Sequence, residues 1–191
     1  MAEIVVETAR LRLREWRDED REPFYDIMNT PAVMRYLGGV QTPEQWAAAH
    51  QRMLGFQRDY GHTFWIVEDK GSGEIQGFCG IKRVNAPGAG DLTDRHEIGW
   101  RLRETAWGKG IAKEAAIASL DLAFARFGAP HVVAMTVPDN VASQGLMARL
   151  GMDRRADLDF KDTRFGPELN PALIWQLDAA DWPAARAAAL A

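Results

Sequence analysis

The chain has 191 residues, of which 47% are hydrophobic and 26% charged, a balance typical of one folded globular domain (residues 1–191) rather than of a disordered protein. The formal net charge of −4 argues against a general nucleic-acid binder, and no apolar run approaches the roughly 18 residues that a membrane span needs. The single cysteine, Cys79, excludes an internal disulfide and a multi-cysteine metal site, and the first residues lack a secretory-signal pattern, so we expect a cytoplasmic protein without a metal or a membrane partner.

The N-terminal third of the chain predicts one strand followed by three helices. Apolar and charged residues alternate from Leu11 to Trp16, which is the pattern of a half-buried strand. Thr42-Pro43-Glu44-Gln45 is a typical helix start, with a Thr cap, Pro at the first helical position and Gln three residues after the cap. The expected helices cover residues 18–28, 32–36 and 42–57.

The rest of the chain predicts strands that alternate with helices. Residues rich in β-formers flank the turn Lys70-Gly71-Ser72-Gly73, which predicts a hairpin. Apolar residues recur at three- and four-residue steps from Gly108 to Phe127, which predicts a helix with a broad buried face. The pattern implies a mixed-sheet α/β layer fold. The expected strands cover residues 63–68, 75–84, 96–102, 131–137, 157–161 and 173–177, and a further short helix covers 140–150.

The turn that opens the long helix carries two glycines. Gly108-x-Gly110-x-Ala112 follows an expected strand, so free backbone N–H groups would point at one spot where the helix dipole favours an anion. Lys109 or Lys113 would add positive charge, and glycine lets the backbone approach phosphate oxygens closely. A tight strand-to-helix turn without a ligand remains the alternative. A dinucleotide fingerprint fits less well because Lys113 stands at its third-glycine position, and a P-loop fits less well because the G-K-[ST] ending is absent.

Three segments in fixed order resemble the GNAT superfamily of N-acetyltransferases. His96-Glu97-Ile98-Gly99-Trp100 leads through a strand to Trp107-Gly108-Lys109-Gly110-Ile111-Ala112-Lys113-Glu114-Ala115. Thr136-Val137-Pro138-Asp139-Asn140-Val141-Ala142-Ser143 resembles the second cofactor motif of the ribosomal-protein N-terminal acetyltransferase (RimJ/RimL-like) branch. Other segments that resemble this branch are Leu11–Arg14, Pro31–Gly38 and Leu150–Met152.

The resemblance covers about residues 8–178 and leaves the alanine-rich tail, residues 179–191, outside it. It implies a mixed, mostly antiparallel central sheet of about seven strands flanked by helices. Two splayed parallel strands, here Glu97–Leu102 and Val132–Val137, would form the acyl-CoA cleft. The implied reaction moves an acetyl group from acetyl-CoA to a primary amine by direct attack in a ternary complex. A backbone N–H near Trp100 to Leu102 would then face the thioester oxygen.

The resemblance also implies which residues contact the cofactor. The superfamily's pyrophosphate signature is [QR]-x-x-G-x-[GA], and Trp107 stands here at its first position, which leaves backbone donors to bind the diphosphate. Asn140 would bond the pantetheine amides, although Asn also caps helices well and the two roles are compatible. The implied cofactor contacts are Leu102, Arg103, Trp107, Gly108, Lys109, Gly110, Ile111, Ala112, Lys113, Asn140 and Ser143.

Two residues are candidates for catalysis. Glu97 is the expected general base, acting through water, because superfamily members often carry a glutamate in this strand; its alternative role is an ion pair with Arg95 or Arg101. His96 alternates to the opposite face, so at most one of the two side chains points into the cleft, and an exposed strand-end histidine is its plainer interpretation. Ser143 would assist the leaving thiolate by a hydrogen bond or by relaying water, or it is a helix-surface serine.

Other residues have a structural and a functional interpretation. Cys79 is either an acyl carrier or, as we favour, a small buried residue. Arg12 and Arg14 share a strand face that we expect to be solvated rather than an anion site. Tryptophans that would line the cleft or belong to the core are Trp65, Trp100 and Trp107.

The acceptor is constrained mainly by acid–base chemistry. An α-amine with a pKa near 7.8 costs roughly 1 kcal/mol to deprotonate at pH 7, whereas a lysine side chain near 10.4 costs about 4.6 kcal/mol, which favours a protein N-terminus or a small α-amine. We expect acceptor selectivity to lie in the helices from Glu22 to Arg58 and in the loop from Thr163 to Pro171. A non-catalytic acyl-CoA-binding module and a nucleotide-binding structural protein are the alternatives, and a homodimer is left open.

Overall fold

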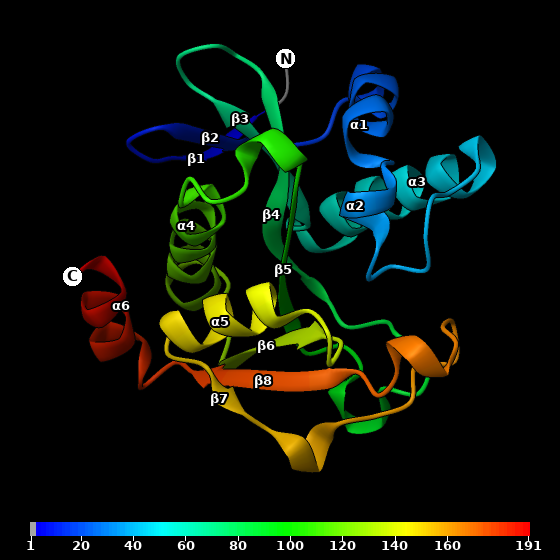
Figure 1. Cartoon of the computed structure of the whole chain (residues 1–191). Coiled ribbons are helices and arrows are strands. Elements are labelled where there is room, and N and C mark those ends of the chain that lie inside the picture. The colour runs from blue at the N-terminus through cyan, green and yellow to red at the C-terminus, as the bar shows by residue number, and fades with distance from the viewer. Residues whose placement is uncertain (1–2) are drawn as a thin grey trace.

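Across residues 3–191, which the structure describes, a computed structural model shows one eight-stranded mixed sheet in the order β1-β2-β3-β4-β5-β6-β8-β7 (Figure 1). Neighbouring strands are antiparallel except β5 and β6, which run parallel. The expected mixed, mostly antiparallel sheet is confirmed, with one strand more than the seven expected. The strands are β1 (Ile4–Glu7), β2 (Leu11–Arg14), β3 (Phe64–Asp69), β4 (Ile75–Arg83), β5 (His96–Leu102), β6 (His131–Thr136), β7 (Asp153–Arg154) and β8 (Leu173–Asp178).

Helices cover both faces of this sheet. The first three lie on one side and the fourth on the other, with the last two packed into the same core as the fourth (Figure 1). No helix of the described residues is long and apolar enough to cross a membrane. The helices are α1 (Arg21–Met28), α2 (Pro31–Met34), α3 (Pro43–Tyr60), α4 (Ile111–Ala125), α5 (Val141–Arg149) and α6 (Trp182–Leu190).

Strand β3 shows how the sequence supplies two cores at once. Trp65 and Val67 belong to the core under α4, whereas Phe64 and Ile66 belong to the core under α1 to α3. Successive side chains of a strand point to opposite faces, so a continuous apolar run is what a strand covered on both sides requires. The same alternation decides which residues of β5 face which layer.

The predicted start of α3 is confirmed. The Gln45 N–H donates to Thr42 Oγ1 at 3.3 Å and the Thr42 N–H donates to Gln45 Oε1 at 2.9 Å, a reciprocal capping box. The helix runs past the expected Gln57 and ends at Gly61, whose φ of 70° is left-handed and therefore favours glycine.

Near the C-terminus the predictions were partly wrong. Residues 157–161 do not form a strand: they contribute one bridge, from Phe160 to Ala172, while the two-residue β7 lies earlier. A two-residue strand carries no alternating pattern, so the sequence could not reveal it. The alanine-rich tail forms α6, in keeping with alanine's high helix propensity, and the Trp182 Nε1–H donates to Asp121 Oδ1 at 2.9 Å.

Arg14 corrects a further expectation. It is 4% exposed rather than solvated, and its guanidinium donates to both Asp20 oxygens at 2.8 and 2.9 Å and to Glu68 at 2.9 Å. Arg12, on the same strand, is partly exposed and pairs with Glu7 at 2.8 Å. Alternation alone did not show that carboxylates from β3 and the turn before α1 close over Arg14.

Candidate active site

The parallel strands β5 and β6 separate in the middle of the sheet. A single pair, Glu97 with Val133, joins them in register, whereas β6 pairs with β8 along its whole length. Beyond that pair, Gly99 to Arg101 are partly exposed, although β5 is a central strand and its first three residues are buried. The structure therefore opens the sheet between the two strands that the resemblance implied to be splayed.

Backbone amides of β5 point into this separation. The Arg103 N–H donates to the Gln76 carbonyl at 2.9 Å, and the Val84 N–H donates to the Arg95 carbonyl at 2.9 Å, so odd-numbered residues of β5 bond to β4. Because successive amides of a strand point to opposite sides, the N–H groups of Trp100 and Leu102 face β6. Donors so placed can bind an oxygen that enters between the strands.

The glycine turn lies directly after β5. Gly108 has a φ of 71° and Gly110 a φ of 74°, conformations that favour glycine. Gly110 is the N-cap of α4, and no side chain of residues 3–191 caps the helix. The first backbone bond into the helix runs from the Glu114 N–H to the Gly110 carbonyl at 3.0 Å, so the preceding amides are free donors at the positive end of the helix. The helix begins at Ile111 rather than at Gly108 as expected, because two left-handed residues cannot continue a right-handed helix.

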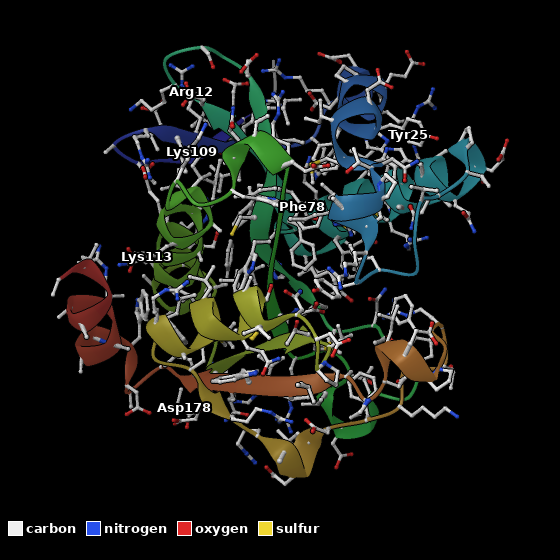
Figure 2. All side chains as sticks on the ribbon, viewed as in Figure 1. Arg12, Tyr25, Phe78, Lys109, Lys113 and Asp178 are labelled. Carbon is white, nitrogen blue, oxygen red and sulfur yellow. The ribbon has the colours of Figure 1, made fainter. Side chains whose placement is uncertain are left out.

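Cationic side chains surround this turn. Lys109 and Arg103 line a cavity of about 460 Å³ together with Arg10, which also donates to the Lys109 carbonyl at 2.9 Å. Figure 2 shows Lys109 in the turn before α4 and Lys113 beside the helix, and within the described residues neither is in an ion pair. The Glu114 carboxylate accepts hydrogen bonds from Thr8 and Arg10; although burial acts to raise its pKa, these bonds lower it, and they hold this anion on the β1–β2 turn.

Trp107 and Leu102 fix the chain between β5 and the turn. The Trp107 Nε1–H donates to the Leu102 carbonyl at 2.8 Å, and the Trp107 side chain remains 49% exposed. Trp100 is partly exposed at the strand separation, whereas Trp65 is 1% exposed and belongs to the core. Only two of the three tryptophans considered in the sequence therefore reach the surface near the turn.

The start of α5 brings Asn140 and Ser143 together. Asn140 is the N-cap, and its Oδ1 accepts the Ser143 N–H at 3.2 Å, which confirms the capping role. Ser143 is partly buried. At the end of β6, Thr136 is 8% exposed and its Oγ1 has no hydrogen-bond partner among the described residues. A buried hydroxyl without a partner is costly, so it marks a place where a polar ligand group fits.

Glu97 forms a buried ion pair with Lys82. The two residues face each other across β4 and β5, and each is 9% exposed. Lys82 Nζ also donates to Asn85 Oδ1 at 3.3 Å. Glu97 was expected to pair with Arg95 or Arg101 if it were not the base, and that choice of partner was wrong. The Arg95 Nε–H donates to the Asp91 carbonyl instead.

His96 lies on the opposite face from Glu97, as alternation predicted, but it is 6% exposed rather than exposed. Its ring centre lies 5.5 Å from that of His62, which contacts Phe127. Burial, followed by the charge of Arg83, lowers the pKa of His96 to about 4, and burial also lowers the pKa of His62. Both imidazoles are therefore neutral at pH 7, and His96 is part of the core under α4.

Cys79 is fully buried, with its sulfur 3.6 Å from Ser119 Oγ. Burial raises the pKa of its thiol to about 12, so the nucleophilic thiolate is absent at neutral pH. The favoured interpretation as a small buried residue is consistent with this environment.

The two segments expected to select the acceptor approach each other. A Cβ at Gly38, which lies between α2 and α3, would be 3.4 Å from the ring of Phe165 in the loop from 163 to 171. In the same loop, Arg164 binds Asp162, whose hydrogen bonds raise the Arg164 pKa, and the charge of Glu97 contributes to that rise. The loop therefore lies against the segment between α2 and α3.

Three residues near the strand separation were not singled out by the sequence. Lys82 is one of two cations in the predicted strand 75–84, and pairing this strand in register with the strand 96–102 would have placed it opposite Glu97. Thr136 is the last residue of β6, and in the sequence it stood only as the first residue of the segment that resembles the second cofactor motif, with no role of its own. Arg101 was considered only as a partner for Glu97, whereas its guanidinium lies 5.0 Å from the ring centre of Phe78.

Comparison with known proteins identifies this arrangement. The family described as "Acetyltransferase (GNAT) domain" matches residues 10–153. YkkB of Bacillus subtilis (strain 168) is 35% identical over 149 residues, which are 76% of this chain and 83% of YkkB. An acetyltransferase from Agrobacterium tumefaciens str. C58 has a TM-score of 0.73 at 26% identity, over 90% of this chain and 92% of its own. The ribosomal-protein-S5-alanine acetyltransferase from Vibrio fischeri shares the fold, with a TM-score of 0.73 at 18% identity over 94% and 99% of the two chains. The chain therefore belongs to the GNAT family of N-acetyltransferases.

Proposed function

We propose that the protein transfers the acetyl group of acetyl-CoA to a primary α-amine, on a protein N-terminus or a small molecule, in a ternary complex. The observation that carries this proposal is the separation of β5 from β6 directly before an uncapped helix with two left-handed glycines. Acetyl-CoA, an elongated molecule with a diphosphate in its middle, fits this arrangement. Its diphosphate requires free backbone amides, and its pantetheine arm requires an opening between two strands.

The free amides at the start of α4, from Gly108 to Lys113, would bind the diphosphate, with Lys109 and Lys113 adding positive charge. Asn140 Nδ2 and the partnerless Thr136 hydroxyl would bind the pantetheine amides. The Trp100 and Leu102 amides would stabilise the thioester oxygen as it gains charge. Trp107 and Arg103 would contact the remaining parts of the cofactor.

In the proposed reaction the amine nitrogen attacks the thioester carbon, the C–S bond breaks, and the sulfur leaves as a thiolate. Glu97 would accept the proton of the amine through water. Three residues along a strand span roughly 10 Å, so a direct contact from Glu97 to an amine beside Trp100 is too long. Ser143 would donate a hydrogen bond to the departing sulfur.

Cofactor binding is tested with two matched glycine variants. Gly110→Ala places an L-residue at a φ of 74° in the turn, and the turn relaxes away from the geometry that aims its amides. We expect the Kd for acetyl-CoA, measured by calorimetry, to rise by about tenfold, since the strain is on the order of 1–2 kcal/mol. Gly128→Ala is the control, because Gly128 has a similar φ of 62° at the other end of α4.

Turnover is tested by following thiol release from acetyl-CoA over peptides, amino acids, polyamines and aminoglycosides. We expect release with α-amines at neutral pH. If calorimetry showed no binding of acetyl-CoA, or if Gly128→Ala weakened binding as much as Gly110→Ala, the assignment of the glycine turn would be wrong. If the protein bound acetyl-CoA but released no thiol with any amine, the alternative of a non-catalytic acyl-CoA-binding module would replace the proposed enzyme.

A further inference from the structure

Arg101 carries a charge that the described chain does not neutralise. Its polar contact is a weak one, from Nη1 to the sulfur of Met34 at 3.6 Å, and its guanidinium stacks over Phe78 at 5.0 Å. Burial lowers the pKa of Arg101 to about 10, so the group is still charged at neutral pH. A partly buried cation without an anion is costly, and chains usually provide a carboxylate beside it.

The acidic residues nearest to Arg101 on this segment already have partners. Glu97, four residues earlier on the same face of β5, is paired with Lys82. Glu104, three residues later, accepts the hydroxyl of Thr30 at 2.7 Å. The fork of Arg101 is therefore left for an anion from outside the chain.

The position of Arg101 connects it with the proposed reaction. It lies in the partly exposed stretch of β5, and the amides that flank it, on Trp100 and Leu102, are those that face the strand separation. Its side chain lies on the face of the sheet that the N-terminal helices cover and points toward α2 and Phe78. Figure 2 shows Phe78 between the sheet and these helices. A molecule whose amine reached the strand separation from that face would have its next few atoms beside the guanidinium.

We propose that the acceptor is a primary amine that also carries a carboxylate a few bonds away, and that Arg101 binds this carboxylate. The proposal rests on the acetyl transfer proposed above and names the class of acceptor. A guanidinium binds a carboxylate through two parallel N–H···O bonds, which fix the orientation of the carboxylate in addition to neutralising its charge. The ring of Phe78 packs against one face of the planar guanidinium. The ring and the sulfur of Met34 exclude water from one side, which strengthens the ion pair.

The wild-type protein gives the first test. Thiol release is compared for free amino acids against their amides, and for amidated dipeptides that begin with Asp or Glu against those that begin with Asn or Gln. Rates are corrected for the fraction of neutral amine. We expect kcat/KM to favour the carboxylate of at least one set by about 10- to 100-fold, the range typical of a hydrogen bond to a charged group. The two sets distinguish an α-carboxylate from a side-chain carboxylate, and equal rates within both sets would overturn the proposal.

The second test removes the guanidinium. In Arg101→Met the preference should fall to near one, chiefly through a higher KM for the carboxylate substrate, while the amide is acetylated as before. Arg101→Lys should keep part of the preference, because it retains the charge without the fork. Arg126→Met is the control, since Arg126 also lies over a ring, 5.6 Å from the centre of Phe127, but at the exposed end of α4.

Thermal unfolding and acetyl-CoA affinity are measured for each variant. An unchanged carboxylate preference in folded Arg101→Met would overturn the proposal; if that variant does not fold, the wild-type comparison and Arg101→Lys decide. Failure of the proposed function looks different, because then the wild type releases no thiol with any amine or does not bind acetyl-CoA.

Discussion

Glu97 and Lys82 form a buried charge pair beside two aromatic rings. Lys82 Nζ lies 5.4 Å from the ring centre of Phe64 and 5.6 Å from that of Phe56, so neighbouring rings as well as Glu97 stabilise its charge. A buried pair of this kind is costly to break from one side, because the remaining charge has no partner. Glu97 thus has a structural role at the last point where β5 and β6 pair, next to the proposed role as a base.

Substitution of Glu97 separates these two roles. If Glu97 is the base, Glu97→Gln should lower kcat by about 10²- to 10⁴-fold and leave the Kd for acetyl-CoA unchanged. Steady-state thiol release and calorimetry measure the two quantities. The double variant Lys82→Met/Glu97→Gln removes both charges, so it should recover stability lost in the single variant without recovering turnover. A kcat within a few-fold of the wild type would remove Glu97 from the mechanism.

At the scale of elements, α4 organises the half of the molecule that surrounds the proposed cofactor site. Its N-terminal end is uncapped, and Glu114 ties its first turn to the β1–β2 turn through Thr8 and Arg10. Farther along, Asp121 accepts hydrogen bonds from Trp182 and Arg186 of α6. The C-terminal helix therefore braces the same element whose amides are proposed to bind the diphosphate.

Two variants of α6 measure this bracing. Trp182 is 5% exposed and belongs to the core under α4, so Trp182→Ala should lower the free energy of unfolding by about 3–5 kcal/mol. Arg186 pairs with the same Asp121 at the surface, and Arg186→Ala should cost no more than about 1 kcal/mol. Urea denaturation distinguishes them, and equal effects would mean that α6 is held by its surface charge rather than by its packed indole.

For the whole molecule, two histidines in the core tie stability to pH. His62 and His96 are 2% and 6% exposed, and both have pKa values below the ordinary value of 6.5. His62 Nδ1 lies 2.9 Å from the Ile81 carbonyl, and Arg83 acts to lower the pKa of both rings. The unfolded chain takes up protons at these rings more readily than the folded protein does.

Stability should therefore fall as the pH is lowered from about 6.5 toward 4, and it should be insensitive to these rings above pH 7. The loss should reach on the order of 2–3 kcal/mol, given about 1.4 kcal/mol per pKa unit. Urea denaturation at pH 7.5 and pH 5.0 measures it, in a window above the titration of most carboxylates. His96→Phe should reduce the difference between the two pH values. The same free energy of unfolding at both pH values in the wild type would contradict this prediction.

The sequence by itself determined most elements and the motif that identifies the family. Local signals are sufficient where one residue type satisfies one backbone requirement, as at Thr42, at Asn140 and at the glycines of the turn. The order of strands and helices predicted the mixed sheet, and the resemblance to the GNAT superfamily implied the separation of β5 from β6. The boundary of α4 was missed by three residues, because the left-handed φ of Gly108 and Gly110 is a property of the folded turn.

Only the tertiary structure decided the partners of the charged side chains. The strand pattern predicted a solvated Arg14, but in the structure Asp20 and Glu68 bind its guanidinium in a buried position. Glu97 pairs with Lys82 of the neighbouring strand rather than with a nearby arginine in the sequence. Arg101 could be recognised as lacking an anion only after each neighbouring acid had been placed. Pairing across strands joins residues that are distant in sequence, so a pattern along one strand can show which face a charge occupies but not what it meets there.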